Sequence, residues 1–460
     1  MTDVHCGLLV IGGGPGGSVC ASRAARLGVD TMLVERGPLG GTCLNVGCIP
    51  SKALIHAAEL FHGATRQAGA GSCGVHVAAP RLDFGETRAW MDGVTGKLRA
   101  GVAGLLEKSG VKSVQGTARF LDGKSVEVTG DTGKTIIRAD AVVIATGAQP
   151  VSLPGLPIGG AVLDSTAALA LDALPDRLAV VGAGYIGLEL GTAFAKLGVQ
   201  VTLIEAAEAI LPQYDSRLTR PVRRRLDDLG IAVETGTRVE GWDAATGTLT
   251  LSNGEDSRSL QTDKVLVTVG RVAQTDGLGL DQLSLRMDRG LIHVDDTCQT
   301  SMRGVYAIGD VTPGPMLAHR ATAQAEVVAD VVAGHAARWD KRVIPEVCFT
   351  DPEIVSVGLS PAQADTEVSV SDFSFRANGR ALTLDDTEGF VRLVCREADK
   401  VILGVQAVGP GVSELAGSFA QAIEAGLRAE DIAATVHPHP TLSEAWQEAA
   451  LGLASMANHG

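Results

Sequence analysis

With 460 residues, of which 45% are hydrophobic and 20% charged, the chain has the composition of a folded globular protein and not of a disordered or fibrous one. This length predicts about three domains of about 150 residues each. The formal net charge of −14 argues against nucleic acid or an anionic membrane as a partner.

The first residues give no sign of a targeting segment. They contain Asp3 and neither Lys nor Arg, and they run directly into an apolar strand pattern, so we expect no signal or transit peptide. Two apolar stretches, 7–21 and 179–195, are interrupted by glycines at turn spacing, which favours strand–turn–helix units over membrane spans. The sequence predicts a cytoplasmic protein without a membrane partner.

An internal repeat with a constant offset of 170 residues organises the chain. Residues 8–35 and 178–205 each read as an apolar strand, a G-x-G-x-x-G turn, a helix, a Leu-Gly stop and a second strand ending in Glu. This is the dinucleotide-binding fingerprint in its required context, in which the backbone approaches a pyrophosphate and the Glu accepts hydrogen bonds from a ribose. The matched residues are Gly12 with Gly182, Gly14 with Gly184, Gly17 with Gly187, and Glu35 with Glu205.

Two such sites in one chain predict FAD and a pyridine nucleotide, although a duplicate that has lost its site is an alternative. We assign FAD to the first copy because a cysteine pair follows it and because residues 300–310 form an apolar strand ending in Asp310, whose simpler reading is a helix N-cap. The second copy contains Glu205, which suits a free ribose 2′-hydroxyl and repels a 2′-phosphate, so NAD is favoured over NADP.

Cys43 and Cys48 lie close together just before a helical pattern. In an ideal helix their Cα atoms would be about 8.7 Å apart, which exceeds the roughly 7 Å limit of a disulfide. If they form a bridge, the helix must be distorted there, and Gly47 and Pro50 would permit that. The C-x-x-x-x-C spacing does not suit a metal, and no metal site is expected.

Two further groups are expected to have no chemical role. The arginines at 220 and 223–225, followed by two aspartates, suggest a solvated helix face. The remaining cysteines occur singly and are expected to be small core residues: Cys6, Cys20, Cys73, Cys298, Cys348 and Cys395.

The chain resembles the flavin-dependent pyridine nucleotide-disulfide oxidoreductases, and the similarity extends over essentially its whole length. The resemblance is carried by residues 41–52, Met316-Leu317-Ala318-His319, residues 377–381 and residues 437–444. The resemblance implies a homodimer. Within the family the chain is most similar to members that oxidise dihydrolipoamide to lipoamide and reduce NAD to NADH. It thus implies, as partners, lipoyl domains of 2-oxo-acid dehydrogenase complexes or a glycine cleavage carrier.

The resemblance also implies catalytic roles. Cys43 would attack the substrate, Cys48 would be the thiolate facing the flavin, and His439 would be the general base, oriented by Glu444. Read without the resemblance, a His between prolines is a rigid loop residue or part of a two-His metal site with His437, and Glu444 is a first-turn helix acid.

Cofactor contacts are implied in the same way. Lys52, otherwise an ordinary exposed helix residue, would pair with Glu189 beside the flavin, and Tyr185 would cover the nicotinamide pocket. The remaining implied cofactor contacts are Arg36, Gly41, Thr42, Gly116, Thr146, Gly147, Ile186, Val239, Gly270, Arg271, Leu317 and Ala318.

Rival functions can be compared on the sequence. A glutathione-type reductase would use NADPH, which Glu205 disfavours, and a mercuric reductase would need vicinal cysteines that residues 451–460 do not contain. Another flavin disulfide reductase acting on a small disulfide, and a non-catalytic subunit of a complex, remain as alternatives.

The predicted fold is α/β, with two Rossmann-like dinucleotide-binding domains and a C-terminal α+β dimerisation domain. The expected limits are 1–149 for the FAD domain, 150–270 for the NAD domain, 271–345 for a central domain completing the FAD site, and 346–460 for the interface domain. We expect a helical hairpin between the first repeat and Ala145-Thr146-Gly147, strands at 391–395 and 401–409, and a helix at 413–427.

Overall fold

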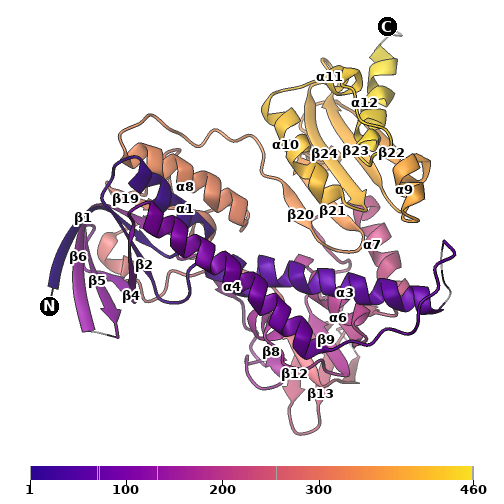
Figure 1. The fold of residues 1–460 in the computed structure, drawn as a ribbon, viewed down its shortest axis with the longest axis horizontal. Helices are drawn as coiled ribbons and strands as arrows, with labels where there is room; N and C mark the ends of the chain where they lie inside the picture. Colours follow the sequence, from indigo (N-terminus) through magenta and orange to yellow (C-terminus); the bar gives the residue numbers. More distant parts are fainter. Residues whose placement is uncertain (1, 70, 72, 132, 255, 458–460) are drawn as a thin grey trace. The chain divides into compact units, whose positions relative to one another are not determined.

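The computed structural model describes residues 2–69, 71, 73–131, 133–254 and 256–457. The chain divides into two compact units, which we describe separately (Figure 1). The first unit comprises Met1–Ile158, Leu163–Leu174 and Val269–Asp340. The second comprises Gly159–Val162, Pro175–Thr268 and Lys341–Gly460.

A mixed sheet forms the centre of the first unit, with the strand order β3-β2-β1-β6-β5-β4 and β19 paired with β6. Its first strand alternates between two cores, because Leu9 and Ile11 belong to one cluster of buried residues and Leu8 and Val10 to the other. Burial on both faces is typical of a parallel sheet covered by helices. The strands are β1 (Thr2–Ile11), β2 (Thr31–Glu35), β3 (Lys112–Gln115), β4 (Thr117–Phe120), β5 (Ser125–Gly130), β6 (Gly133–Ile144) and β19 (Val305–Ala307).

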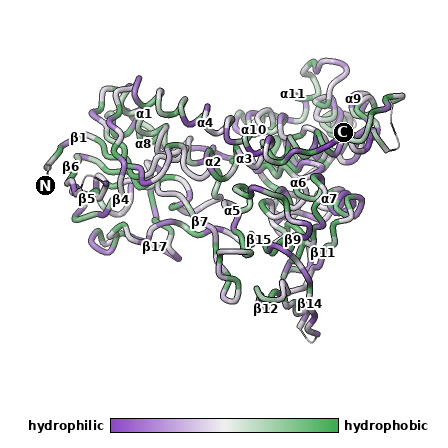
Figure 2. Tube along the Cα trace, turned by 60° about the horizontal axis from the view of Figure 1, so that its bottom comes forward, coloured by the Kyte–Doolittle hydropathy of each residue, from purple (hydrophilic) through white to green (hydrophobic). Residues whose placement is uncertain are grey.

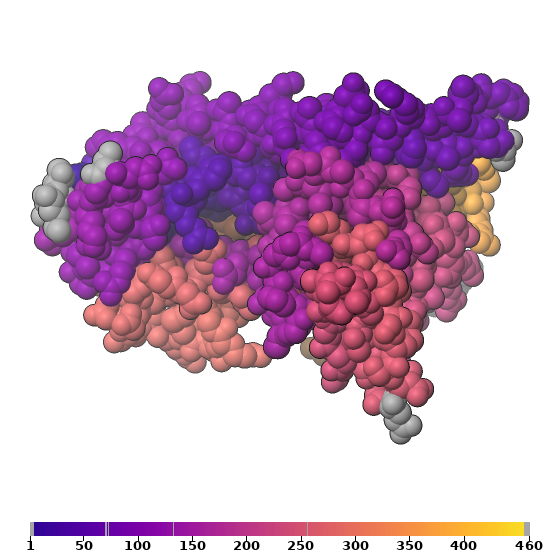
Figure 3. Space-filling model, turned by 90° about the horizontal axis from the view of Figure 1, so that it is seen from below, coloured from indigo at the N-terminus to yellow at the C-terminus, as the bar shows by residue number. Residues whose placement is uncertain are grey.

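Helices α1 (Pro15–Arg26) and α8 (Ala318–Val332) pack against each other in this unit, and Arg23 forms an ion pair with Asp330 between them. The predicted helical hairpin is confirmed as α3 (Cys48–Gly69) and α4 (Phe84–Lys108), whose side chains lie at the surface along much of their length (Figure 3). The smaller elements are α2 (Gly41–Val46), β7 (Ala148–Pro150), α5 (Ser165–Leu169), β16 (Arg271–Ala273), η1 (Leu280–Leu283), β17 (Met287–Asp288), β18 (Leu291–Ile292) and η2 (Gly309–Val311).

In the second unit a sheet with the strand order β11-β10-β9-β15-β8 repeats the first dinucleotide fold, and the strands from β11 to β15 in this order are parallel. Its helix α6 is buried on almost every side, and Figure 2 shows long hydrophobic stretches around α6 and β9. The elements are β8 (Val162–Leu163), β9 (Arg177–Val181), α6 (Tyr185–Lys196), β10 (Gln200–Ile204), α7 (Ser216–Asp228), β11 (Ala232–Glu234) and β15 (Lys264–Val267), with a separate antiparallel sheet of β12 (Arg238–Asp243), β13 (Thr248–Ser252) and β14 (Ser257–Gln261).

The C-terminal part of the second unit is an antiparallel sheet with the order β20-β21-β24-β23-β22. Its core joins the sheet to α10 and α12, and the rings of Phe419 and Trp446 from these helices lie 4.9 Å apart. The predicted strands and helix are confirmed. The elements are β20 (Glu346–Cys348), β21 (Glu353–Gly358), η3 (Pro361–Gln363), β22 (Val368–Ser374), η4 (Phe375–Ala377), α9 (Gly379–Thr383), β23 (Phe390–Arg396), β24 (Ile402–Gly409), η5 (Val412–Leu415), α10 (Ala416–Glu424), α11 (Ala429–Ala434) and α12 (Glu444–Ala457).

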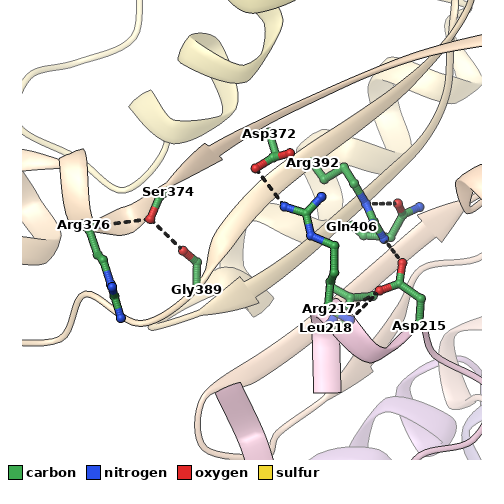
Figure 4. Close-up of polar contacts among 9 residues, drawn as sticks. All are labelled: Asp215, Arg217, Leu218, Asp372, Ser374, Arg376, Gly389, Arg392 and Gln406. Carbon is green, nitrogen blue, oxygen red and sulfur yellow. Dashed lines mark hydrogen bonds and ion pairs between the residues drawn. The ribbon is translucent and has the colours of Figure 1, made fainter. Parts of the chain in front are cut away.

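The prediction of a solvated helix face on α7 holds for Arg220, which is exposed, but was wrong for Arg224 and Arg225, which pair with acids of the C-terminal part. α7 packs against the C-terminal sheet, and several of its arginines meet acids from residues 351–388. These pairs are Arg217 with Asp372 (3.0 Å), Arg224 with Glu388 (3.5 Å) and Arg225 with Asp351 (3.3 Å). Figure 4 shows the first of them beside a second arginine, Arg392, on β23. The periodicity of a charged helix does not reveal which acids a distant strand places opposite it.

The single cysteines follow the prediction with one exception. Five of them are buried, but Cys73 is exposed, because it lies in the glycine-rich connection between α3 and α4 rather than in a core. In the part of the chain that the structure describes, no helix has both the length and the apolar character needed to cross a membrane.

Candidate active site

The first glycine-rich turn lies between the end of β1 and the start of α1, as predicted. Gly12 has a φ of 106°, a conformation that favours glycine, and a Cβ there would lie 2.3 Å from the carbonyl oxygen of Ala145. A Cβ on Gly17 would lie 1.8 Å from the Gly12 carbonyl oxygen. The two glycines therefore allow α1 to start directly against the turn.

The start of α1 suits a phosphate group. Gly14 is its N-cap, and within the described residues no side chain caps this end and no acid occupies the first turn. The first N–H groups of a helix have no partner within the helix, and the positive end of its dipole attracts anions. The turn and the helix start therefore form a cradle that fits the diphosphate of a dinucleotide.

Glu35 is fixed at the end of β2 beside this turn. Its Oε2 accepts a hydrogen bond from the Gly13 N–H (2.6 Å) and its Oε1 accepts one from the Gly37 N–H (2.8 Å). A carboxylate has about four acceptor positions, so this one can still accept the hydroxyls of a ribose. This geometry fits the ribose contact that the motif predicts.

The second copy reproduces this arrangement at the same offset. Gly182 has a φ of 101°, and Glu205 accepts hydrogen bonds from the N–H groups of Ala183 (2.7 Å) and Ala207 (2.8 Å). Thr268, which the sequence analysis missed, donates its hydroxyl to the Gly182 carbonyl (2.9 Å). The internal repeat is therefore preserved down to single hydrogen bonds.

Other residues of the second copy lie where its fingerprint places them. Gly184 caps α6, whose N-terminus again has no side-chain cap among the described residues. Tyr185 is the first residue of α6 and is exposed, and Ile186 follows it. A Cβ on Gly187 would lie 2.0 Å from the Gly182 carbonyl oxygen.

The cysteine pair forms a disulfide, and the helix is interrupted between the two residues as predicted. α2 ends at Val46, Gly47 has a φ of −141° and a ψ of −115°, and α3 begins at Cys48. The Cα atoms of Cys43 and Cys48 are 4.6 Å apart, about half the separation in an ideal helix. Cys48 is exposed and Cys43 is half-buried, so a ligand can reach this bridge.

Asn45, between the two cysteines, supports this turn, and the sequence analysis did not single it out. Its side-chain amide donates to the carbonyl oxygens of Gly41 (2.9 Å) and Leu39 (3.0 Å), and its Oδ1 accepts from Nε of Arg99 on α4 (2.9 Å). Because its amide nitrogen donates to the backbone and its oxygen accepts from α4, Asn45 fixes the backbone that leads into the disulfide turn. Its position inside the motif was the available signal.

The ends of three parallel strands in the first unit bring further predicted residues to one edge of the sheet. Gly12 follows β1, Thr146 follows β6 and Asp310 follows β19, which pairs with β6. Ligands of open α/β sheets bind at this carboxyl edge. Burial raises the pKa of Asp310, and the positive charges of Arg271 and Arg320 oppose that rise.

Local contacts hold several of the other predicted cofactor residues. Thr146 donates to the Gln274 carbonyl oxygen (2.7 Å), and Arg271 donates to that of Ala148 (2.6 Å). A Cβ on Gly116 would lie 2.8 Å from the Thr129 carbonyl oxygen. In the first unit, Arg36 follows β2, Gly41 and Thr42 begin α2, Gly147 follows β6, Gly270 precedes β16, and Leu317 and Ala318 begin α8; in the second unit, Val239 lies in β12.

Glu189 is buried on α6, and its Oε1 accepts a hydrogen bond from the Phe349 N–H (2.9 Å), just beyond β20. The carboxylate therefore fixes α6 to the C-terminal part of the second unit. Lys52 lies in α3 of the first unit. Its pairing with Glu189 stays a prediction.

His439 and Glu444 contact each other as the family pattern requires. Nδ1 of His439 lies 2.8 Å from Oε1 of Glu444, while Oε2 accepts the Thr441 N–H (2.8 Å). The hydrogen bonds from Thr441 and then from His439 lower the pKa of Glu444, so this carboxylate stays ionised at neutral pH. An ionised partner favours the tautomer with hydrogen on Nδ1, which leaves Nε2 able to accept a proton.

The readings of this loop made without the resemblance have different outcomes. Glu444 is the first residue of α12, as its reading as a first-turn acid predicts. His437 Nδ1 contacts the Thr435 carbonyl oxygen (2.9 Å) instead of its neighbour His439. In the described residues no group of three or more His, Cys, Asp or Glu side chains is arranged to hold a metal.

Two dinucleotide folds, the first followed directly by a disulfide in a broken helix, define a class of protein: the disulfide oxidoreductases that use two dinucleotide cofactors. Comparisons with known proteins agree. The profile of the pyridine nucleotide-disulphide oxidoreductases matches residues 7–325, and the profile of their dimerisation domain matches residues 344–450.

Dihydrolipoyl dehydrogenase from Pseudomonas aeruginosa is 51% identical over 456 residues, which are 98% of each chain. The enzyme of the same name from Geobacillus stearothermophilus is 45% identical and covers 96% of this chain and 95% of its own. Among solved structures, LpdA from Mycobacterium tuberculosis superposes with a TM-score of 0.90 at 28% identity, covering 98% of this chain and all of its own length (100%).

The chain belongs to the pyridine nucleotide-disulphide oxidoreductase family. It is an NAD-dependent flavoprotein disulfide oxidoreductase, and FAD and NAD, predicted from the two fingerprints, are its cofactors. Its dimerisation domain makes it a homodimer. The predicted fold class is confirmed.

Proposed function

We propose that the chain is a dihydrolipoyl dehydrogenase, which oxidises dihydrolipoamide to lipoamide and reduces NAD to NADH. The observation on which this rests is the Cys43–Cys48 disulfide, which follows the first dinucleotide fold in a partly exposed turn. The choice of substrate is supported by relatives named dihydrolipoyl dehydrogenase, at 44–51% identity over nearly the whole chain.

The proposed reaction is a thiol–disulfide exchange in two attacks. A thiolate of the dithiol attacks the sulfur of Cys43, which breaks the bond to Cys48 and releases Cys48 as a thiolate. Nε2 of His439 then takes the proton of the second substrate thiol. The resulting thiolate attacks the substrate sulfur bound to Cys43, so that lipoamide leaves and the Cys43 thiolate takes a proton.

The enzyme is then a dithiol that holds the electron pair of the substrate. Bound FAD supplies a two-electron carrier between this dithiol and NAD, so the balance is one dithiol oxidised for one NAD reduced, with release of one proton. The chain itself supplies the glycine turns for the diphosphates and Glu35 and Glu205 for the riboses. Asn45 holds the turn that contains the disulfide.

The remaining site and domain assignments are part of this proposal. They include the limits 1–149, 150–270, 271–345 and 346–460, the pairing of Lys52 with Glu189, and the position of Tyr185 over the nicotinamide. They also include a cytoplasmic location and lipoyl domains as protein partners. Within the described residues, the lack of a membrane-crossing helix is compatible with that location.

The test is NAD-dependent oxidation of dihydrolipoamide by the purified holoenzyme. We expect Cys43→Ser and Cys48→Ser each to lower the rate by about 10³-fold or more, as for loss of an attacking nucleophile. Cys73→Ser, which changes an exposed cysteine outside the site, should retain the full rate.

NADH-dependent reduction of ferricyanide should persist in both serine variants, because this acceptor needs no dithiol. Full lipoamide activity in either variant would refute the redox pair. If the wild type turned over glutathione disulfide and not lipoamide, the redox pair would stand and the substrate would be wrong.

A further inference from the structure

The loop of residues 309–317 connects β19 to α8 and contains Asp310. It begins at Gly309, whose φ of 72° favours glycine, and includes Gly314, with a φ of 120°. Such a loop needs contacts from outside itself to keep one conformation. These contacts come from the first two turns of α8.

Arg320 provides most of them. Its side chain lies inside the loop, and the residue is only 5% exposed. The guanidinium donates to the Thr312 hydroxyl (2.8 Å) and to the Pro315 carbonyl oxygen (3.2 Å). It also donates to the carbonyl oxygens of Gly309 and Pro313. Arginine suits this position because its planar group presents five donors in a fixed geometry, which an ammonium cannot do.

The loop closes tightly around this group. A Cβ on Gly314 would lie 2.9 Å from Cζ of Arg320, so glycine is needed for the close approach. Gln324, one turn further along α8, accepts the Gly309 N–H through Oε1 (2.7 Å). Thr312 donates to the Gly309 carbonyl oxygen (2.8 Å). The N–H of Gly309, the residue before Asp310, is thereby fixed by α8, and its carbonyl is fixed by Thr312 and by Arg320 of α8.

A buried cation is costly unless its hydrogen bonds and charge are compensated. The loop carbonyls accept the hydrogen bonds of Arg320, and the negative charge of Asp310 stabilises its positive charge. A hydrocarbon side chain would leave these loop carbonyls without donors. The buried guanidinium therefore fixes the conformation of the loop and acts through its charge on Asp310.

We infer that Arg320 is a positioning residue of the FAD site, holding loop 309–317 in the conformation that presents Asp310 to the cofactor. This inference rests on the proposed assignment of Asp310 to FAD. It predicts that Arg320 acts on cofactor binding through Asp310 and not merely on the stability of the fold.

The test follows FAD release from the diluted holoenzyme by the rise in flavin fluorescence. Arg320→Met should speed release by about 10- to 100-fold, the range expected for lost hydrogen bonds to a charged group. Arg320→Lys keeps the charge but not the donor geometry, so it should also speed FAD release. If the methionine variant does not fold, the lysine variant tests the positioning role in its place. The matched control, Arg23→Met, removes an ion pair to α8 away from the loop and should leave the rate unchanged.

A double-mutant comparison separates positioning from stability. Asp310→Asn alone should speed release, and adding Arg320→Met to it should then change the rate by less than about threefold. If Arg320→Met had the same effect with and without Asp310, or no larger effect than Arg23→Met, the positioning role would be refuted while the function stood. If Asp310→Asn left FAD release unchanged, the assignment of Asp310, and with it this inference, would fall. Lipoamide turnover, measured separately, tests the proposed function.

Discussion

Glu205 is the residue that we expect to select between NAD and NADP. Both of its carboxylate oxygens accept backbone N–H groups near the end of β10, so the carboxylate is held in one orientation. A free 2′-hydroxyl can donate to this carboxylate, whereas a 2′-phosphate would meet a like charge at close range. The same contacts at Glu35 show that the position is a property of the fold.

We therefore predict that Glu205→Arg raises the NADPH-to-NADH ratio of kcat/KM by about 10- to 100-fold, the effect of exchanging a repulsive charge for one good ion pair. Glu205→Gln is the matched control and should give a smaller rise, because it removes the charge without adding one. Both ratios are measured as reduction of lipoamide at saturating disulfide. Equal use of the two nucleotides by the wild type would show that this carboxylate does not select the cofactor.

The residues that sequence could assign were those whose role follows from backbone geometry or from a short motif. Gly12 and Gly17 are examples, because a turn and a close approach demand glycine at fixed spacing. Arg320 was missed because most of its partners are carbonyl groups of a loop, which carry no sequence signal. Asn45 lies inside the motif, but its backbone partners carry no signal of its role either. Both side chains hold the backbone next to a predicted site residue.

At the scale of elements, helix α7 is tied to the C-terminal sheet through its own N-cap (Figure 4). Asp215 accepts the Arg217 N–H through Oδ1 (2.9 Å), and its Oδ2 accepts a hydrogen bond from the guanidinium of Arg392 on β23. Arg392 also donates to Oε1 of Gln406 on β24 (3.1 Å) and is only 3% exposed. One carboxylate thus starts a helix and pairs with a buried cation of the neighbouring sheet.

This contact gives stability a defined dependence on pH. Burial raises the pKa of Asp215, but the hydrogen bond from Arg392 and those from the α7 backbone outweigh it, so the pKa is lowered. The contribution of Asp215 is therefore full above its unfolded value of about 3.9 and is lost as the pH falls through the lower folded value. We expect the free energy of unfolding in urea to fall more steeply below about pH 4 in the wild type than in Asp215→Asn.

At pH 7, Arg392→Met should cost about 1–3 kcal/mol, less than for a fully buried pair because Asp215 is partly exposed. Arg223→Met is the control, since its exposed pair with Asp227 within the helix should contribute about 0.5 kcal/mol or less. If the two variants were equally stable, α7 would not be held by this contact. The sequence predicted the helix but not this role, because the partner lies about 180 residues further along the chain.

At the scale of the whole molecule, the loop of the second unit that contains His439 is open to solvent. The side chain of His439 is 79% exposed and the neighbouring Val436 is 92% exposed. A proposed base works best where water is excluded and its partners are fixed. In a homodimer of this family, the second subunit is the natural source of that cover, and symmetry would then build each site from two chains.

This arrangement makes a prediction about mixed dimers. His439→Gln should lower dithiol oxidation by about 10²- to 10⁴-fold as a homodimer, the usual contribution of a general base, and Cys43→Ser should abolish it. If His439 serves the Cys43 of the other subunit, a purified heterodimer of the two variants has one intact site and should recover roughly half the wild-type rate.

A second heterodimer provides the matched control, since it contains the same two substitutions in one chain. When wild type is paired with the double variant Cys43→Ser/His439→Gln, a site shared between subunits would leave both sites damaged, so activity should be lost. If each site were confined to one chain, the outcomes would be reversed: the first heterodimer would be inactive and the second would retain about half the rate. The two measurements differ only in how the substitutions are distributed, so a change in stability or cofactor content cannot imitate the predicted pattern.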